Sequence, residues 1–346
     1  MTEIHIRIEG RAGRITLDRP KALNALTYDM ILQIEAALDG WAEADIDLLL
    51  IDAQGEKAFC AGGDIAEMYA SGKRGDLQYG RTFWRDEYRM NRKLFHFPKP
   101  VVTFLQGFTM GGGVGVGCHG SHRIVCDTSR IAMPEVAIGL VPDVGGSLIL
   151  AQAPGRLGEY LGTTGYRMTA ADAIHTGFAD YFIPLEKWDT LKSTLIKEGD
   201  VSAVDTVATS PGVSQLATWQ ADIDAAFAGD TLGDIYRGLP DPLPPALQKA
   251  VELMAANAPL SMAVAIEMVR RVRGAATIEN ALDQEYRFTF RAMEHGDFIE
   301  GIRAAIIDKD RNPKWRHANW SDVSGADVLR MTLPLGKDAL NWKETP

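Results

Sequence analysis

The chain has 346 residues, is 46% hydrophobic and carries a formal net charge of −10. This apolar content excludes intrinsic disorder and is enough for one large core, or for a core with a smaller appended domain. The acidic balance argues against a nucleic-acid partner, because binding to phosphate backbones depends on clustered Lys and Arg.

The first hundred residues predict alternating strands and helices. Residues 4–17 predict a β-hairpin, because apolar residues alternate with polar ones on both sides of a glycine turn. Thr27 predicts the N-cap of an amphipathic helix that ends before Asp45. The runs 48–52 and 101–106 are apolar without alternation, which is typical of parallel strands covered on both faces.

A glycine-rich segment follows each of these two apolar runs. The segments are residues 59–64 and 107–117, and helical sequence follows each of them. The chain therefore repeats a unit of strand, glycine turn and helix. This repeat predicts an α/β fold, with a core over residues 1–184.

The remaining residues, 185–346, predict a mainly helical region. Apolar residues there recur at spacings of three and four, as in Met262, Ile266 and Val269. Asp297 and Glu300 predict a capping box before an apolar run that ends at Ile307. Residues 229–245 predict an irregular connection.

Two motifs could suggest other functions. Residues 115–120 match the dinucleotide fingerprint by letter, but the preceding strand is expected to end near Gln106 and another strand to begin at Arg123, so close packing of a helix is the better interpretation. Four potential zinc ligands lie close together, but they lack paired Cys-x-x-Cys spacing. They are Cys118, His119, His122 and Cys126. We therefore expect neither a bound nucleotide nor a metal ion.

The two glycine turns together favour acyl chemistry. A strand-to-helix turn points free backbone N–H groups outward at the positive end of a helix dipole. Two such turns that face each other would form an oxyanion hole for a thioester carbonyl. The alternative, that these turns only allow tight packing, stays open at this point.

Two carboxylates, Glu135 and Asp143, lie eight residues apart in an otherwise apolar stretch, residues 132–146. An acid in apolar surroundings tends to have a raised pKa, and two acids in different surroundings can divide acid and base or nucleophile roles. The alternative is a helix N-terminal charge at Glu135 after Pro134 and a loop-capping Asp143.

Four runs together resemble the crotonase superfamily. They are residues 59–65 (FCAGGDI), 107–113 (GFTMGGG), 133–135 (MPE) and 142–146 (PDVGG). Within this superfamily the chain is similar to the 3-hydroxyisobutyryl-CoA hydrolases over nearly its whole length, including residues 297–303 and 307–315. The resemblance implies a spiral of repeated ββα units, with C-terminal helices that cover an active site or build a homo-oligomer.

The same resemblance implies which residues act in the hydrolysis of a short 3-hydroxyacyl-CoA thioester. The amides of Gly63 and Gly112 would be the oxyanion donors, and Glu135 and Asp143 the reacting carboxylates. Glu87 matches a position at which the hydrolases contact the substrate. Acyl transfer of this kind needs no metal or organic cofactor, and CoA enters as part of the substrate.

Further substrate contacts are expected close to these residues. Asp64 follows Gly63 and is expected to contact the substrate. Arg19 or Lys21 is expected to meet the CoA phosphates.

The chain departs from the hydratase pattern at Gly115. Enoyl-CoA hydratases carry a catalytic Glu in the turn after the triple glycine, where this chain has Gly115, and they usually have glycine where it has Asp143. This difference favours hydrolysis over hydration. Some isomerases also place an Asp there, so an isomerase stays an alternative, and a non-catalytic acyl-CoA binder is another.

The cysteines and the first residues of the chain indicate in which cellular compartment we expect the protein. The three cysteines, Cys60, Cys118 and Cys126, are an odd and small set, typical of a reducing compartment. The first ten residues include two glutamates and lack an apolar signal core, and no later apolar run reaches the roughly 18 residues of a membrane span. We therefore expect free thiols, no membrane partner and a cytoplasmic location.

Overall fold

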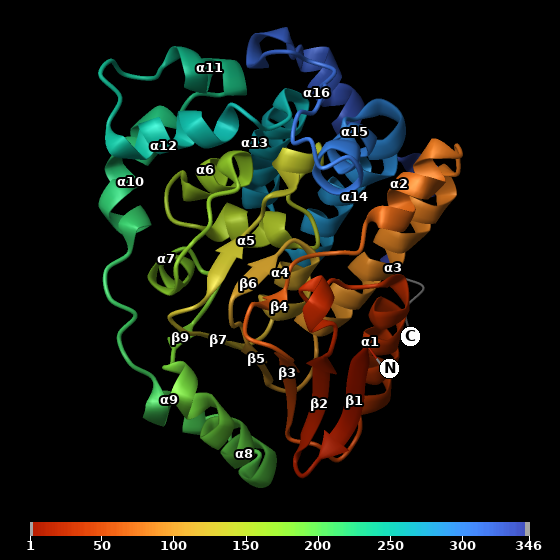
Figure 1. Ribbon diagram of the computed structural model, residues 1–346, viewed down its shortest axis with the longest axis vertical. Helices are drawn as coiled ribbons and strands as arrows, with labels where there is room; N and C mark the ends of the chain where they lie inside the picture. Colours follow the sequence, from red (N-terminus) through yellow and green to blue (C-terminus); the bar gives the residue numbers. More distant parts are fainter. Residues whose placement is uncertain (1–2, 343–346) are drawn as a thin grey trace. The chain divides into compact units, whose positions relative to one another are not determined.

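Strands and helices alternate up to residue 182 in the computed structural model, which describes residues 3–342, and helices dominate after that residue (Figure 1). Two compact units are built from interleaved segments. Unit 1 takes its residues from Met1–Asp64, Asp86–Ala132 and Arg167–Ala217, and unit 2 from Ile65–Arg85, Met133–Tyr166 and Thr218–Pro346. Residue 184, the predicted domain boundary, lies within unit 1, and the division made from the sequence stays a prediction.

Unit 1 contains a six-stranded sheet with the order β1-β2-β3-β5-β7-β9 (Figure 1). Its strands are β1 (Ile4–Glu9), β2 (Ala12–Leu17), β3 (Leu48–Ala53), β5 (Val101–Phe104), β7 (His122–Val125) and β9 (Tyr181–Phe182). The first two strands form the predicted antiparallel hairpin, and the other neighbours pair in parallel. Residues 48–51 of β3 are fully buried, as their unbroken apolar run predicts.

A second, three-stranded parallel sheet lies in unit 1, with the order β4-β6-β8. Its strands are β4 (Ala58–Cys60), β6 (Phe108–Met110) and β8 (Arg130–Ala132). Two strands thus precede each glycine turn, β3 and β4 before the first and β5 and β6 before the second. The local sequence pattern had indicated a single strand before each turn. The mixed α/β fold with ββα repeats agrees with the predicted class.

The helices account for most of the other described residues. The α-helices are α1 (Tyr28–Trp41), α2 (Ala66–Lys73), α3 (Leu77–Phe95), α4 (Gly112–Gly117), α5 (Gly146–Gln152), α6 (Leu157–Thr164), α7 (Ala170–His175), α8 (Trp188–Glu198), α9 (Ala203–Val207), α10 (Gln215–Ala226), α11 (Leu232–Arg237), α12 (Pro245–Met254), α13 (Pro259–Gly274), α14 (Ile278–His295), α15 (Phe298–Ile302) and α16 (Gly325–Thr332). As predicted, the Thr27 side chain caps α1 by accepting a hydrogen bond from the Met30 N–H.

Helices α8 and α9 cover one face of the six-stranded sheet. Leu48 and Leu50, two residues apart and therefore on the same face, belong to one core cluster with Leu191 and Leu195 of α8. The rings of Phe104 and Trp188 meet edge to face with centroids 5.2 Å apart. This packing buries one face of β3 and β5.

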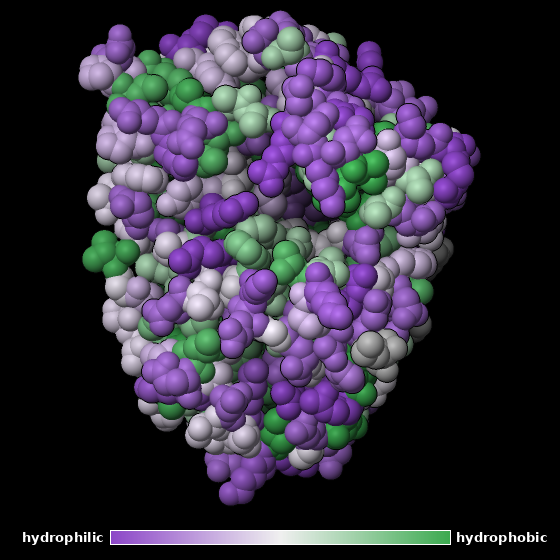
Figure 2. Space-filling model, viewed as in Figure 1, coloured by the Kyte–Doolittle hydropathy of each residue, from purple (hydrophilic) through white to green (hydrophobic). Residues whose placement is uncertain are grey.

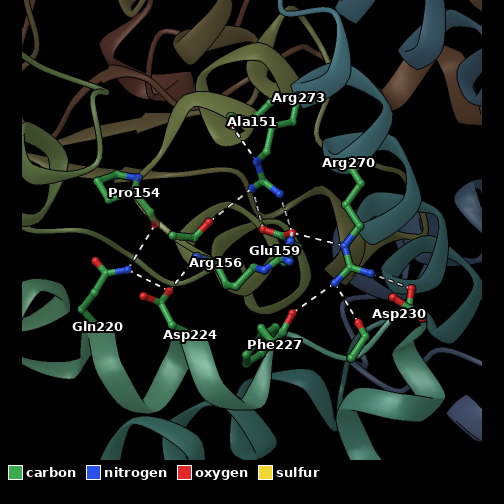
Figure 3. A network of polar contacts seen from close by, with 12 residues as sticks. Ala151, Pro154, Arg156, Glu159, Gln220, Asp224, Phe227, Asp230, Arg270 and Arg273 are labelled. Atoms are coloured by element: carbon green, nitrogen blue, oxygen red, sulfur yellow. Dashed lines mark hydrogen bonds and ion pairs between the residues drawn. The ribbon is translucent and has the colours of Figure 1, made fainter.

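In unit 2, α13 packs against both α5 and α6. The residues predicted to face its core, Met262, Ile266 and Val269, are buried. A fully buried carboxylate, Glu159 of α6, is held by three arginines (Figure 3): Arg156 at 2.9 Å, Arg270 at 3.2 Å and Arg273 at 2.8 Å. Burial opposes its ionisation, but the hydrogen bonds and charge of Arg273 lower the pKa of Glu159 to about 2.

The capping box predicted at Asp297 and Glu300 is wrong. Asp297 is the N-cap of α15, but its side chain makes no capping hydrogen bond and instead accepts one from the Arg316 N–H at 2.8 Å. Glu300 pairs with Arg303 at 2.8 Å, in a π-helix (η4, Arg303–Ile307). The Asp297 side chain therefore binds a backbone amide 19 residues later, and Glu300 pairs with the arginine three residues after it.

The irregular connection predicted at residues 229–245 is also partly wrong, since it contains α11. The Thr231 and Asp234 side chains form a capping box at the start of this helix. The helix is short, so its apolar pattern covers too few residues to be recognised.

One face of the molecule is mostly hydrophilic (Figure 2). On the face in Figure 2, hydrophobic residues occur in small groups between hydrophilic ones. No helix within residues 3–342 has the length and apolar character needed to cross a membrane.

Candidate active site

The first glycine turn follows β4 and is held by Leu26. The Leu26 N–H donates to the Gly62 carbonyl at 2.9 Å, and the Asp64 N–H donates to the Leu26 carbonyl at 2.8 Å. Because backbone groups alternate in direction along an extended segment, the N–H of Gly63 points away from Leu26. This N–H is therefore available to a ligand on the other side.

The second glycine turn faces the first within unit 1. A Cβ atom on Gly112 would lie 3.3 Å from the Gly63 nitrogen, and a Cβ atom on Gly62 would lie 4.0 Å from the Gly112 nitrogen. Gly112 is the first residue of α4, so its N–H has no carbonyl within the helix to bind. The two N–H groups predicted as oxyanion donors thus lie close together.

Helix α4 can come this close only because it carries glycine. A Cβ atom on Gly113 would lie 2.2 Å from the Cys60 carbonyl oxygen of β4, which is far inside contact distance. Gly117 is pressed against Leu105 and Phe59 in the same way. These contacts agree with close packing of a helix at residues 115–117, whereas residues 118–120 lie beyond the end of α4. The same contacts set the spacing of the two turns.

The carboxylate of Glu87 lies beside the same turn. Glu87 is on α3 and is 3% exposed, and its Oε1 atom lies 3.1 Å from the place of a Gly112 Cβ atom. Burial, with a contribution from the Glu87 charge, raises the pKa of the Cys60 thiol to about 12. Unit 1 therefore brings Gly63, Gly112 and Glu87 together.

The residues predicted to meet the rest of the substrate are more exposed. Arg19 donates hydrogen bonds to Glu3 at 2.8 Å, to the Ala25 carbonyl at 2.6 Å and to Asp64 at 3.2 Å. Asp64 is thus tied to Arg19 beside the first glycine turn. Lys21 is exposed in a 3₁₀ turn (η1, Pro20–Ala22), whereas Arg19 is engaged by Glu3 and Asp64.

Glu135 lies in unit 2, at the start of a 3₁₀ helix (η2, Glu135–Ile138), and is 5% exposed. This short helix ends at Gly139, which has a φ of 72°. A Cβ atom on Gly139 would lie 2.5 Å from the Asp297 carbonyl carbon, and one on Gly301 would lie 2.1 Å from the Ile138 carbonyl oxygen. Glycines on both sides therefore let α15 hold the turn that carries Glu135.

Asp143, also in unit 2, is 4% exposed and precedes a strained turn. Val144 has a φ of 55°, a left-handed conformation that costs a β-branched residue about 1–3 kcal/mol. Gly145 follows with a φ of 79°, and the Gly146 N–H closes the turn on the Asp143 carbonyl at 2.7 Å. Strain of this kind next to a buried acid is typical of functional sites.

The sequence analysis missed another buried carboxylate, Glu285 of α14, which is fully buried. It accepts hydrogen bonds from the Gly145 N–H at 2.8 Å, from the Ser147 N–H at 3.0 Å and from the Ser147 hydroxyl. Burial, assisted by the charge of Asp143, raises the pKa of Glu285 to about 8 in spite of these donors. In the sequence, Glu285 lies three residues from both Leu282 and Phe288, on the apolar face of α14. This spacing was the signal that could have predicted its burial.

The potential zinc ligands have other partners. Cys118 and Cys126 are buried, the His119 ring packs against Phe95 with centroids 5.8 Å apart, and the His122 ring stacks on Tyr181 at 5.7 Å. Within residues 3–342, no three His, Cys, Asp or Glu side chains gather as metal ligands.

Known proteins of similar sequence and structure act on CoA thioesters, according to their names. The 3-hydroxyisobutyryl-CoA hydrolase, mitochondrial, of Gallus gallus is 35% identical over 352 residues, which cover 98% of this chain and 90% of the relative. A solved enoyl-CoA hydratase from Rhodobacter sphaeroides 2.4.1 is 50% identical, with a TM-score of 0.95, and the match covers 99% of this chain and 100% of that chain. A carnitinyl-CoA dehydratase from Mycobacterium thermoresistibile is 39% identical, with a TM-score of 0.94 and full coverage of both chains.

The family model described as Enoyl-CoA hydratase/isomerase matches residues 12–332, nearly the whole described chain. The glycine turns, the α/β fold and these relatives agree with that match. The chain therefore belongs to the enoyl-CoA hydratase/isomerase family of the crotonase superfamily.

Proposed function

We propose that the protein hydrolyses a short 3-hydroxyacyl-CoA thioester, of the 3-hydroxyisobutyryl-CoA type, to the free acid and CoA. The observation that carries this proposal is the convergence of the Gly63 nitrogen, the start of α4 at Gly112 and the buried Glu87 carboxylate within unit 1. The similarity to the Gallus gallus 3-hydroxyisobutyryl-CoA hydrolase supports the choice of substrate.

In the proposed reaction, the thioester carbonyl oxygen accepts hydrogen bonds from the N–H groups of Gly63 and Gly112. These bonds strengthen as the oxygen becomes negative, and each donor is expected to lower the barrier by about 3 kcal/mol. The positive end of α4 adds to this stabilisation. A water-excluded site, which the buried surroundings of Gly112 favour, increases the effect.

Glu135 acts on the acyl carbon by one of two routes. It either attacks the carbon to form a mixed anhydride that water then hydrolyses, or it removes a proton from a water molecule that attacks the carbon directly. In both routes one water is consumed, the C–S bond breaks and CoA leaves as the thiol with one proton. Asp143 orients or carries that proton.

Glu87 selects the substrate by accepting a hydrogen bond from its β-hydroxyl group. A plain acyl thioester would leave this buried carboxylate without that donor, which penalises its binding. Replacing Glu87 by Ala should therefore reduce the preference for 3-hydroxyacyl over plain acyl thioesters. An unchanged ratio of kcat/KM for the two substrates would remove Glu87 from the acyl pocket.

Three other functions compete with hydrolysis: hydration or dehydration, isomerisation and binding without turnover. The names of the solved structures favour hydration or dehydration of a CoA thioester. Against this, α4 carries the buried Gly115 at the place of the second hydratase acid, which leaves that helix without a carboxylate. An isomerase, and a binder that does not turn over acyl-CoA, are further alternatives that the same assays address.

We further propose that the enzyme needs no metal or organic cofactor, and that it acts in the cytoplasm, either alone or as a homo-oligomer. The relative from Gallus gallus is named mitochondrial, so the location needs its own test, by fractionation of cells that express the protein.

A panel of acyl-CoA thioesters tests the proposal directly. Release of free CoA thiol should be fastest with short 3-hydroxyacyl thioesters and should be unchanged in EDTA. Faster hydration of crotonyl-CoA than release of CoA from any hydroxyacyl thioester would reject hydrolysis, and binding without any turnover would support the non-catalytic alternative. Loss of activity in EDTA that zinc restores would reject the metal-free reaction.

A further inference from the structure

The turn after Asp143 needs an external support. Within residues 3–342, five residues other than glycine have a positive φ, and Val144 is the only β-branched residue among them. A branched Cβ makes the left-handed region especially unfavourable, so an isolated turn of this sequence would relax to a negative φ. Something outside the turn therefore holds Val144 in this conformation.

Glu285 provides that support. Its two carboxylate oxygens bind on both sides of Gly146: Oε2 accepts from the Gly145 N–H and Oε1 from the Ser147 N–H and hydroxyl. A flip of the peptide after Val144 would turn the Gly145 N–H away from Oε2 and break the first of these bonds. The carboxylate thus stabilises the one backbone arrangement in which both amides point at it.

Stability of the fold alone does not explain why this residue is a carboxylate. Glu285 is fully buried, its three donors are neutral, and the charge of Asp143 disfavours ionisation of Glu285. A carboxyl group is costly to bury in such surroundings, but its two oxygens accept hydrogen bonds from both amides at once, which a side chain with a single acceptor oxygen cannot do. The polar group therefore has a role in fixing the geometry of the turn.

We propose that Glu285 is a positioning residue that acts through Asp143. By holding the Gly145 and Ser147 amides, it keeps Val144 left-handed and fixes the direction in which the Asp143 side chain leaves the turn. This inference rests on the proposed function to the extent that it takes Asp143 as a reacting group.

The proposal predicts a specific kinetic pattern. Without the support, Val144 relaxes and Asp143 is displaced, and a displacement of about 1 Å at a reacting group can cost about 100-fold in rate. Glu285→Gln should therefore lower kcat about 10- to 100-fold and leave KM nearly unchanged, because the oxyanion donors are in unit 1. Glu285→Asp, which keeps both acceptor oxygens on a shorter side chain, should recover part of kcat.

Amide hydrogen exchange tests the support independently of activity. Exchange at Gly145 and Ser147 should increase in Glu285→Gln. It should stay unchanged in Glu294→Gln, a matched control that neutralises a half-exposed carboxylate on the same helix. Unchanged exchange at both amides in folded Glu285→Gln would overturn the proposal, whatever the enzyme's substrate is.

Combination with Asp143→Asn separates positioning from a general structural role. If Glu285 acts through Asp143, Glu285→Gln should cause no further loss of kcat when Asp143 is already Asn. A further loss of the same size as in the wild type, or increased exchange with a normal kcat, would overturn the positioning role. If wild-type protein hydrolyses no thioester, the proposed function fails, while the exchange experiment still decides whether Glu285 holds the turn.

Discussion

Glu135 and Asp143 are both buried acids, but their backbones are held by different parts of unit 2. The turn of Glu135 packs against α15 through Gly139 and Gly301, whereas the turn of Asp143 is held by α14 through Glu285. Different supports allow two neighbouring carboxylates to have different environments, which is what divided acid and base roles require.

Removal of either charge should impair the proposed reaction. Glu135→Gln and Asp143→Asn keep the shape of the side chain, so each should lower kcat at least about 100-fold without unfolding the protein. The double variant should lose far less than the product of the two effects, because groups that act in one step are not additive. Steady-state kinetics of the three variants, with circular dichroism to check the fold, measures this.

The same variants distinguish the two routes for Glu135. If Glu135 is the nucleophile, hydroxylamine should trap an acyl adduct on residue 135 in the wild type and none in Glu135→Gln. If Glu135 instead activates water, no adduct should form in the wild type or in Glu135→Gln. Glu135→Gln and Asp143→Asn should still have a lowered kcat. Mass spectrometry of the peptide that contains residue 135 is the measurement, and normal kcat in both variants would contradict the assignment of these acids.

At the scale of elements, the contact between α4 and β4 sets the position of the Gly112 N–H. Gly113→Ala would place a Cβ atom 2.2 Å from the Cys60 carbonyl oxygen, and backbone cannot move aside as a side chain can. We expect about 1–3 kcal/mol of lost stability and about 100-fold lower kcat as α4 moves away. Urea unfolding and kinetics measure the two effects.

Gly40→Ala is the matched control for this substitution. Gly40 lies in α1 with no atom within 4 Å of an added Cβ, so alanine there should stabilise the protein by about 0.5–1 kcal/mol. Normal kcat in Gly113→Ala would show that α4 need not touch β4 for the donors to work.

The contribution of the contact between α6 and α13 to the stability of the fold should depend on pH. The pKa of Glu159 is lowered from 4.5 to about 2, so its stabilising effect is complete above pH 4.5 and is lost as the pH falls towards 2. Glu159→Gln should therefore cost about 3 kcal/mol at pH 7, because the three arginines lose their buried partner, and the cost should shrink below pH 4. Urea unfolding at pH 7 and at pH 3 gives both values.

Glu267→Gln provides the control on α13, since Glu267 pairs with Arg271 at the surface. This exposed pair should contribute about 0.5 kcal/mol or less, with little change across the same pH range. An equal loss in the two variants would mean that burial of Glu159 has no special effect.

Local patterns could be predicted from the sequence, and distant partners could not. The hairpin, the Thr27 cap and the buried run of β3 depend on residues within a few positions of each other, and all three are confirmed. The capping box at Asp297 failed because Arg316, 19 residues later, supplies the hydrogen bond. Glu285 was missed because its partners lie 138 and 140 residues earlier in the chain.

For the candidate site, too, some features were predicted from local sequence and others were not. The glycine motifs predicted the two turns, whose close approach follows from the ββα repeat. The choice of Gly63 and Gly112 as donors came from resemblance to a family and stays a prediction. The roles of Glu135, Asp143 and Glu87 came from resemblance to a family, and they stay predictions. No periodicity indicates which buried acid touches a substrate, because burial and catalysis leave the same polar residue in an apolar stretch.

At the scale of the whole molecule, the three thiols report on unfolding. Burial raises the pKa of Cys60 and of Cys118 to about 12, and Cys126 is buried as well. The folded protein should therefore not react with Ellman's reagent at pH 8, while all three thiols should react in urea. Rapid reaction of a thiol in the folded protein would mean that its surroundings open without global unfolding.

The distance along the chain between Gly145 and Glu285 has a consequence for biosynthesis. A ribosome adds about 5–20 residues each second, so the 140 residues between these partners take roughly 7–28 s to appear. During that interval the nascent chain already contains both glycine turns, Glu135 and Asp143, but not the carboxylate that holds the Val144 turn. A product that terminates before α14 would thus carry the predicted reacting residues without their final support, so the last quarter of translation decides whether a chain becomes a working enzyme.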